Sequence, residues 1–140
     1  MVGSILDLGC GLGFLARFAK ERYLGIDFSP YSIRAARKMG WNPKAKFMRG
    51  DIRNLPDVGQ FDTVAMLEVL EHLEDRQEAV EAAKRLAKQR VVISVPRGHS
   101  RSGDHVWNDI AREDVLVLLG TGTTCHQYRR KWIAVWEAES

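Results

Sequence analysis

The sequence predicts an α/β fold built on a doubly wound, mostly parallel sheet with an antiparallel hairpin at its C-terminal end. Apolar segments suited to strands alternate along the chain with helical segments, a pattern typical of a parallel sheet with helices on both faces. The first apolar segment ends in an acidic residue and a glycine-rich turn, as do strands that present a loop to a ligand. The last two segments, residues 123–130 and 132–137, alternate polar and apolar side chains and favour a hairpin.

The composition is that of an ordinary globular protein, and we expect a single domain spanning residues 1–140. The net charge of +3 neither requires nor excludes a polyanionic partner. Cys10 and Cys125 are too few for a disulfide framework, so we expect two reduced thiols in a cytoplasmic protein. The first residues do not resemble a signal peptide, and no apolar run is long enough to cross a bilayer, so we expect no membrane partner.

Four strands and one short helix are predicted in the first half of the chain. The strands are expected at residues 4–8, 23–26, 45–48 and 61–67. The short helix, over residues 14–21, would turn Leu15, Phe18 and Ala19 toward the sheet.

Two longer helices carry recognisable start and stop residues. Ser29 is a typical N-cap, Pro30 follows at the first helical position, and Gly40 stands where that helix ends. Asp75, with Glu78 three residues later, forms a capping-box pattern at the start of the other helix. Its apolar face consists of Ala79, Val80, Ala83, Leu86 and Ala87.

The last third of the chain begins with its most β-rich run. Residues 91–95 predict a buried central strand, which ends before Pro96. A polar segment, residues 97–109, follows this strand. An apolar helix over residues 115–119 then stops at Gly120.

Four of the predicted parallel strands end in polar residues, at the edge where such sheets bind ligands. The first ends in the glycine loop, residues 7–13, and the second in Asp27, whose carboxylate can accept hydrogen bonds from two vicinal ribose hydroxyls. The third ends in Gly50-Asp51-Ile52, where Asp51 either bonds an adenine amine or makes a turn. The fourth continues into residues 67–72, which include two glutamates and a histidine.

The glycine spacing argues against a nicotinamide dinucleotide. That fingerprint needs its third glycine three positions after the second, and Phe14 occupies this position. The third glycine of this loop is Gly13 instead. The spacing therefore disfavours a nicotinamide oxidoreductase.

Taken in order, these motifs closely resemble those of the class I S-adenosylmethionine-dependent methyltransferases. The resemblance lies in residues 7–13, 25–29, 50–52 and 61–72, and it extends over residues 3 to 137. It implies a Rossmann-like methyltransferase fold, an enzyme, and S-adenosyl-L-methionine as the cofactor.

The resemblance also implies roles for individual residues. The glycine loop, including Cys10, would face the methionine part of the cofactor, and Asp7 would support its ammonium group. Asp27 would hold the ribose hydroxyls, Phe28 and Ile52 would flank the adenine, and Asp51 would meet the adenine amine. Glu68 and Val69 would lie under the sulfonium. The cofactor-binding set implied is Asp7, Gly9, Cys10, Gly11, Gly13, Asp27, Phe28, Ser29, Gly50, Asp51, Ile52, Leu67, Glu68 and Val69.

The methyl acceptor is expected to be a small molecule that reacts through oxygen or nitrogen by in-line displacement, for which alignment supplies most of the rate. A hydroxyl or protonated amine also needs a base, and the candidates are His72, His99, His105 and Glu68. The polar segment after residue 96 is either a solvated loop or an acceptor-binding loop suited to an anionic or planar substrate.

A cation site is the main alternative chemistry. Glu68, Glu71 and His72, completed by His99 or His105, would resemble the metal-dependent methyltransferases that modify the 3′-terminal ribose of small RNAs. The same glutamate–histidine string is widespread in metal-free small-molecule enzymes, so we expect no metal. RNA remains the alternative acceptor.

A non-catalytic subunit is the second alternative. Related enzymes usually carry an N-terminal extension over the cofactor and acceptor, whereas this sequence starts at its first strand. We therefore expect a compact form with an open pocket, covered by a second copy of the chain or by a partner subunit.

Overall fold

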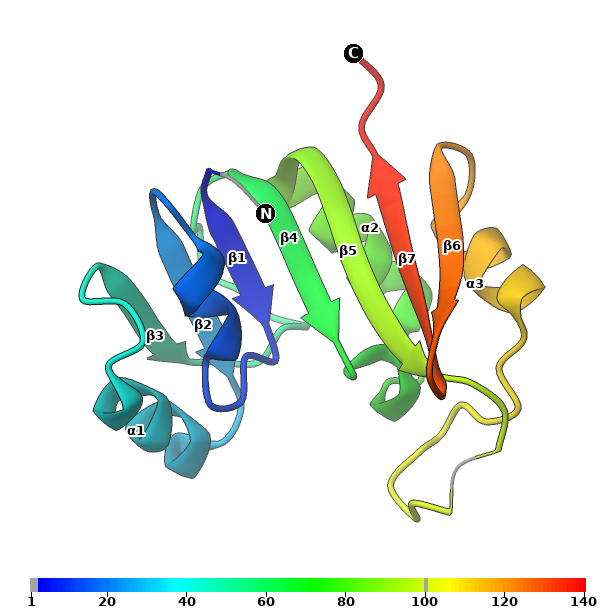
Figure 1. Ribbon diagram of the computed structural model, residues 1–140, viewed down its shortest axis with the longest axis horizontal. Coiled ribbons are helices and arrows are strands. Elements are labelled where there is room, and N and C mark those ends of the chain that lie inside the picture. Colours follow the sequence, from blue (N-terminus) through cyan, green and yellow to red (C-terminus); the bar gives the residue numbers. More distant parts are fainter. Residues whose placement is uncertain (1–2, 100) are drawn as a thin grey trace.

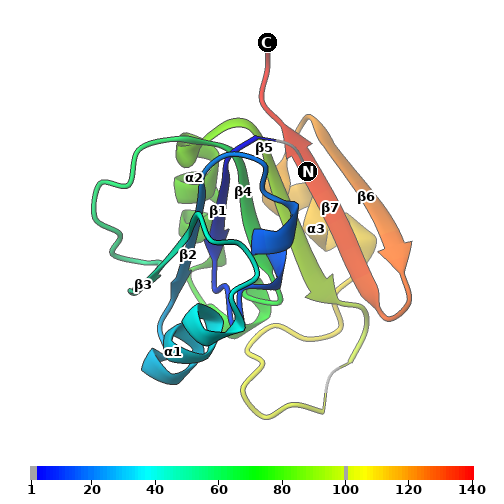
Figure 2. The same cartoon turned by 60° about the vertical axis from the view of Figure 1, so that its left-hand side comes forward.

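The computed structural model describes residues 3–99 and 101–140, and in it a seven-stranded sheet carries helices on both faces (Figure 1, Figure 2). The strand order is β3-β2-β1-β4-β5-β7-β6, and β7 runs in the direction opposite to the other six described strands. The predicted fold class is therefore confirmed. The strands are Ile5–Leu8 (β1), Tyr23–Asp27 (β2), Ala45–Arg49 (β3), Phe61–Leu67 (β4), Ala87–Pro96 (β5), Thr123–Tyr128 (β6) and Lys131–Glu137 (β7). The helices are the 3₁₀ segments Phe14–Phe18 (η1) and Leu70–His72 (η2) and the α-helices Pro30–Met39 (α1), Arg76–Leu86 (α2) and Arg112–Leu119 (α3).

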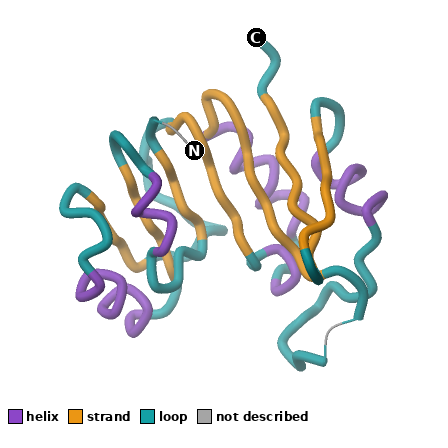
Figure 3. Tube along the Cα trace, in the orientation of Figure 1, coloured by secondary structure: helices purple, strands orange, loops and turns teal. Residues whose placement is uncertain are grey.

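The strand order places a switch point beside β1. The chain runs from β1 outward to β2 and β3, then returns to form β4 on the other side of β1. The loops that follow β1, β4 and β5 leave from the same edge of the sheet (Figure 3). In a sheet of this kind, the crevice at the carboxyl ends of strands flanking the switch point is where ligands bind.

Side chains of β1 alternate between two cores, one on each face of the sheet. Leu6 and Leu8 pack into the larger core, which includes Val64 of β4 and Val80 of α2. Ile5 packs into the smaller core on the other face, with Ala16, Ala19 and Tyr23. All four residues of β1 are buried, as expected of a strand covered on both faces.

The first helix is shorter than the sequence predicted, and Phe18, one of the three residues expected to pack on the sheet, is exposed while Leu15 and Ala19 pack in the smaller core. It is a 3₁₀ helix that ends at Phe18, and the residue that follows, Ala19, is extended. Since a 3₁₀ helix has three residues per turn, Ala16 and Ala19 share one face, and both are buried. Phe18 lies off that face and is 50% exposed, so the prediction that it packs on the sheet was wrong.

The predicted caps are confirmed for α1 and wrong for α2. The Ser29 hydroxyl accepts a hydrogen bond from the Ser32 amide at 3.2 Å, and Gly40 ends α1 with a left-handed φ of 60°. Asp75 precedes α2, but among the described residues its side chain makes no capping hydrogen bond. Its ψ of 37° departs from the extended conformation that an N-cap residue adopts, so its carboxylate is not directed at the first amides.

In the last third of the chain, element types are as predicted but several boundaries differ. The β-rich run is an interior strand that begins at Ala87, a residue predicted to belong to the preceding helix. The last helix begins at Arg112, and the Asp114 carboxylate at its start accepts a hydrogen bond from the Ala111 amide at 2.8 Å. β6 and β7 form the predicted hairpin, with Cys125 opposite Ala134. Within the described ranges, no helix has the length and apolar character needed to span a membrane.

One polar pair is buried in the smaller core, beneath the glycine loop. Asp7 is 3% exposed, and its carboxylate accepts a hydrogen bond from the Tyr23 hydroxyl at 2.7 Å. Burial raises the pKa of Asp7 to about 6, although the Tyr23 hydrogen bond lowers it in part. The charged form of Asp7 is therefore less favourable in the folded protein than in water.

This pair predicts a specific dependence of stability on pH. Because the folded pKa of Asp7 lies above its unfolded value of 3.8, the stabilising contribution is full below that value and is lost as pH rises through about 6. A shift of about two pKa units corresponds to roughly 3 kcal/mol. The isosteric substitution Asp7→Asn removes the titration and keeps an acceptor for Tyr23. Chemical unfolding from about pH 4 to pH 7 should show the wild-type stability falling by about 2 kcal/mol relative to the variant. Parallel pH profiles for the two proteins would contradict the assignment.

Candidate functional site

The loop after β1 depends on glycine at three alternate positions. Gly9, Gly11 and Gly13 all have left-handed φ angles, of 75°, 53° and 75°. A Cβ at Gly9 would lie 2.5 Å from Cγ2 of Val69, and one at Gly13 would lie 2.5 Å from Cε1 of Phe47. Two of the glycines therefore allow close packing as well as the turn, whereas a Cβ at Gly11 would meet nothing within 4 Å among the described residues.

Asp27 is the last residue of β2, and its side chain links the loop after β1 to the loop after β2. One carboxylate oxygen accepts a hydrogen bond from the Gly11 amide and the other from the Ser29 amide, both at 2.9 Å. Each oxygen keeps a second lone pair for another donor. The side chain thus fixes the glycine loop and still presents a carboxylate to a ligand.

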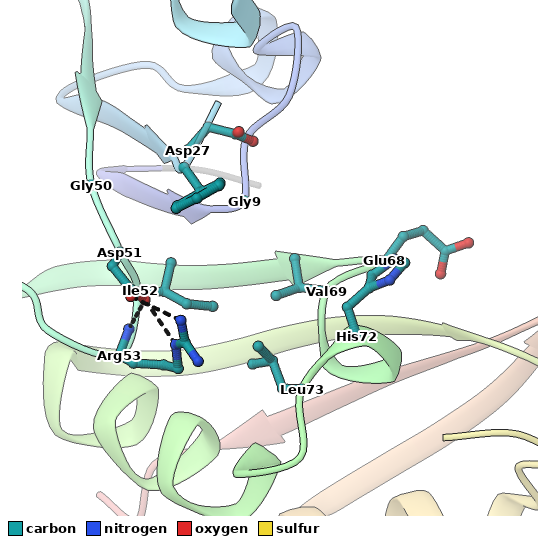
Figure 4. Close-up of a pocket in the computed structure, with 11 residues that line it drawn as sticks. Gly9, Asp27, Gly50, Asp51, Ile52, Arg53, Glu68, Val69, His72 and Leu73 are labelled. Atoms are coloured by element: carbon teal, nitrogen blue, oxygen red, sulfur yellow. Dashed lines mark hydrogen bonds and ion pairs between the residues drawn. The ribbon is translucent and has the colours of Figure 1, made fainter. Parts of the chain in front are cut away.

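A pocket of about 400 Å³ opens at this edge of the sheet, a volume suited to a small ligand. Its apolar side chains Ile52, Val69 and Leu73 lie between two polar ends (Figure 4). Asp51 and Arg53 form one end, and Glu68 and His72 form the other (Figure 4). The pocket is lined by Gly9, Asp27, Phe28, Gly50, Asp51, Ile52, Arg53, Glu68, Val69, His72 and Leu73.

Most residues that the sequence singled out for a cofactor line this pocket, and six do not. Cys10 is buried against β2, where a Cβ on Gly25 would lie 2.9 Å from its Sγ, and burial raises the pKa of its thiol. The Ser29 hydroxyl is engaged in capping α1. The predicted residues that do not line the pocket are Asp7, Cys10, Gly11, Gly13, Ser29 and Leu67.

Asp51 makes the turn that its sequence context suggested as the alternative to ligand binding. Its carboxylate accepts hydrogen bonds from the Arg53 backbone amide at 2.9 Å and from the Arg53 guanidinium at 3.0 Å. This pairing lowers the pKa of Asp51. Arg53 and Leu73 are the pocket residues that the sequence reasoning missed. For Arg53, the sequence signal is its position two residues after Asp51, a spacing at which the two side chains can pair.

Glu68 follows the last residue of β4, lines the pocket and has an unusual backbone conformation. Its φ of 58° lies in the left-handed region, which is costly for a residue with a side chain. The Ser94 hydroxyl donates to its carboxylate at 3.3 Å, and Lys131 forms an ion pair with the other oxygen. The Glu68 amide also donates to the Ser94 carbonyl at 3.0 Å. These contacts with β5 and β7 hold the strained residue in place.

Glu71, His72 and His105 come together beside the pocket. Glu71 is 1% exposed, and burial raises its pKa to about 7. Its Oε1 atom lies 3.9 Å from Nε2 of His72, and the rings of His72 and His105 are 4.8 Å apart in an edge-to-face arrangement. One ligand atom from each residue lies within 4.8 Å of the other two.

The remaining histidine candidate lies apart from this group. His99 pairs with Asp109 at 3.5 Å and lines a second pocket, of about 600 Å³, together with Arg97, Arg101 and Arg130. The structure therefore separates the four base candidates. His72 and Glu68 line the first pocket, His105 contacts His72, and His99 belongs to the arginine-lined pocket.

Comparison with known proteins identifies the fold and the family. Residues 6–95, more than half of the chain, match the family described as the methyltransferase domain. The chain is 31% identical over 134 residues to the ubiquinone biosynthesis O-methyltransferase of Bordetella pertussis, covering 89% of this chain and 54% of that protein. It is 32% identical over 93 residues to the norajmaline N-methyltransferase of Rauvolfia serpentina, covering 60% of this chain and 32% of that protein. The chain thus spans about half the length, or less, of these curated relatives.

Solved structures show the same architecture at lower sequence identity. The N-terminal domain of EvdMO1 with SAH bound has a TM-score of 0.78 and 18% identity, covering 97% of this chain and 74% of that one. A complex of the Haloferax volcanii Trm112 methyltransferase activator with a putative methyltransferase gives a TM-score of 0.75 and 19% identity, covering 99% of this chain and 83% of that one. Together with the glycine loop and its acidic partner on β2, the family match shows that the chain belongs to the methyltransferase domain family, among the class I S-adenosylmethionine-dependent methyltransferases that its sequence resembles.

Proposed function

We propose that this chain binds S-adenosyl-L-methionine in the pocket beside Gly9 and Asp27 and transfers the methyl group to an oxygen or nitrogen atom of a small acceptor. The observation that carries the proposal is the Asp27 carboxylate, which secures the glycine loop and lines the pocket at once. The family match over residues 6–95 supports the cofactor and the reaction class.

The residues of the pocket fit this cofactor. Gly9 contributes backbone without a side chain, so a ligand can approach the loop closely. Asp27 offers free lone pairs to the ribose hydroxyls, and Phe28 and Ile52 provide apolar surface for the adenine. Asp51 can accept a hydrogen bond from the adenine amine through the lone pairs that Arg53 leaves free.

The other end of the pocket suits the reacting groups. When bound, S-adenosyl-L-methionine supplies an electrophilic methyl group on a sulfonium. Glu68 and Val69, after β4, form the wall against which we place this group, and His72 lines the pocket next to them. Because the leaving group is already good, the protein contributes chiefly by aligning the acceptor with the methyl group and by excluding water.

The acceptor class rests on the relatives and on the pocket lining. The printed names of the curated relatives include an O-methyltransferase and an N-methyltransferase. A hydroxyl or protonated amine must lose a proton during transfer, and the titratable side chains that line this end of the pocket are Glu68 and His72.

A partner-dependent form of the same enzyme is the second candidate. Phe28, which lines the pocket, is 72% exposed. One structural neighbour was solved as a complex of a methyltransferase activator with a putative methyltransferase. A second copy of this chain or a separate subunit would cover the exposed surface and complete the acceptor site.

The first test of this proposal is the substitution Asp27→Asn. The amide nitrogen would face the Gly11 or Ser29 amide, two donors that the carboxylate now satisfies, and the negative charge would be lost. Hydrogen bonds to a charged group contribute about 1.5–3 kcal/mol, so calorimetry should show S-adenosylhomocysteine binding about 10- to 100-fold more weakly.

Asp57→Asn is the matched control, because Asp57 accepts a hydrogen bond from the Gly59 amide in an exposed turn and does not line the pocket. It should bind S-adenosylhomocysteine like the wild type. Equal affinity in all three proteins, or no binding to the wild type, would overturn the proposed cofactor site.

The second test is turnover. Release of S-adenosylhomocysteine should be detected when S-adenosyl-L-methionine is offered with a panel of phenols, catechols and amines, and Asp27→Asn should lower the rate at limiting cofactor. Gel filtration of the same sample gives the oligomeric state. A chain that binds the cofactor but transfers no methyl group to any acceptor would contradict independent catalysis and favour the partner-dependent form.

A further inference from the structure

The arginine-lined pocket is the strongest feature outside the proposed cofactor site. It is a hollow of about 600 Å³, and none of the described residues that line it is acidic. Three of its side chains are guanidinium groups, which remain positively charged in proteins. Its lining consists of Pro96, Arg97, His99, Arg101 and Arg130. The side chains around this hollow are those that bind an anion.

The three guanidinium groups have no carboxylate partner in the part of the chain that the structure describes. Arg97 donates to the side-chain oxygen of Gln127 at 3.2 Å, a neutral acceptor that leaves its charge uncompensated. Like charges around one hollow repel one another, and an anion bound between them would relieve that repulsion. Arginine also suits carboxylates and phosphates in particular, because its planar group donates two parallel hydrogen bonds to them.

Backbone hydrogen bonds hold the walls of this pocket together. The Arg97 amide donates to the Arg130 carbonyl at 2.8 Å, which joins the segment after β5 to the turn between β6 and β7 (Figure 1). The next residue, Gly98, donates to the Ile110 carbonyl at 3.4 Å and accepts from the Asp109 amide at 3.1 Å. Arg97 and Arg130 are therefore presented by main chain that is already fixed in place.

The arginine-lined pocket and the first pocket lie at the same edge of the sheet. Pro96, at the end of β5, lies opposite Lys131 of β7, and Lys131 forms an ion pair with Glu68 of the first pocket. Ser94, whose hydroxyl donates to the Glu68 carboxylate, is two residues before Pro96, so both side chains lie on one face of the sheet. Because β5 lies between β4 and β7 and neighbouring strands are about 4.8 Å apart, β4 and β7 are roughly 10 Å apart.

We propose that the arginine-lined pocket binds the anionic group, a carboxylate or a phosphate, of a small methyl acceptor. The inference rests on the proposed function and names its class of substrate. The reacting oxygen or nitrogen of such an acceptor would lie at the Glu68–His72 end of the first pocket, roughly 10 Å from the anion. A substituted aromatic acid or a sugar phosphate can span that length. An acceptor held at both ends is aligned with the methyl group, which is the main contribution of the protein to this reaction.

The surroundings of the pocket favour a compact anion over a nucleic acid. Asp109 pairs with His99 at 3.5 Å, and Glu68 pairs with Lys131, the residue after Arg130. A nucleic-acid backbone is bound by cations that follow a path of successive phosphates. Here carboxylates adjoin the basic residues. We therefore assign the arginines to a single anionic group.

The test is a chemical-shift titration of the ¹⁵N-labelled full chain with phenyl phosphate and, separately, with benzoate. At least one of these anions should shift the amide signals of Arg97, Gly98 and Arg130 with a single saturable binding constant, and neutral phenol should not. The tighter of the two shows whether phosphate or carboxylate is preferred. Arg97→Gln and Arg130→Gln should each weaken that binding about 10-fold, as expected when a charge-assisted hydrogen bond is lost.

Arg129→Gln is the matched control, because Arg129 belongs to the same turn as Arg130, carries the same charge and does not line the pocket. It should bind the anion like the wild type. Far-ultraviolet circular dichroism and S-adenosylhomocysteine binding check that each variant folds. The inference fails if neither anion gives a saturable shift, or if Arg129→Gln loses as much affinity as Arg130→Gln. A single-stranded oligouridylate that binds far more tightly, and loses affinity equally in all three variants, would assign the arginines to a nucleic-acid surface instead.

Turnover tests the link between this pocket and the acceptor. Pairs of acceptors that differ in charge alone, such as caffeate and its methyl ester, are offered with S-adenosyl-L-methionine. The acid should have the lower KM, and Arg130→Gln should raise that KM about 10-fold while leaving the KM values of ester and cofactor unchanged. Equal use of acid and ester would contradict the proposal. Anion binding is measured without cofactor, so a chain that binds S-adenosylhomocysteine but neither anion refutes this pocket alone, and the reverse result refutes the proposed cofactor site.

Discussion

The pocket depends on one carboxylate that accepts two backbone hydrogen bonds. Asp27 stands at the end of β2 and bonds the amides of Gly11 and Ser29, so the loops after β1 and β2 are held together. Loop glycines lose more conformational freedom on folding than other residues, and a charge-assisted bond at the centre of the loop offsets part of that cost. The same side chain positions the start of α1. Ile52 and Val69 line the same pocket as Gly9 and Asp27, so their apolar side chains face loops that this carboxylate holds in place.

Several other acidic side chains lie at the same edge of the sheet, and each has a different partner. Asp7 is buried against Tyr23, Asp51 is neutralised by Arg53, and Glu68 is paired with Lys131. Glu71 is the exception, since one of its buried oxygens lacks a partner among the described residues. A row of carboxylates at the ends of parallel strands is unfavourable unless each is compensated.

Local patterns predicted most of the fold, and long-range contacts account for what was missed. The strands, the Ser29 cap and the glycine loop follow from neighbouring residues, so the sequence alone located them. The exposure of Phe18 depends on whether the helix is 3₁₀ or α, which periodicity over five residues does not decide. The sequence offered both His99 and His105 as the histidine beside Glu71 and His72, and the choice of His105 depends on backbone bonds between residues far apart in the chain. No spacing rule contains that information.

The position of Cys10 has a practical consequence. Cys10 is part of the glycine loop and its thiol is buried against Gly25, and the other cysteine, Cys125, is buried in the larger core. Burial raises the pKa of both thiols, and the reactive thiolate is therefore scarce in the folded chain. Alkylating reagents would modify Cys10 only while the loop is lifted from the sheet. The chain thus carries a native chemical reporter of loop opening, whose labelling rate measures how firmly a bound ligand closes the site.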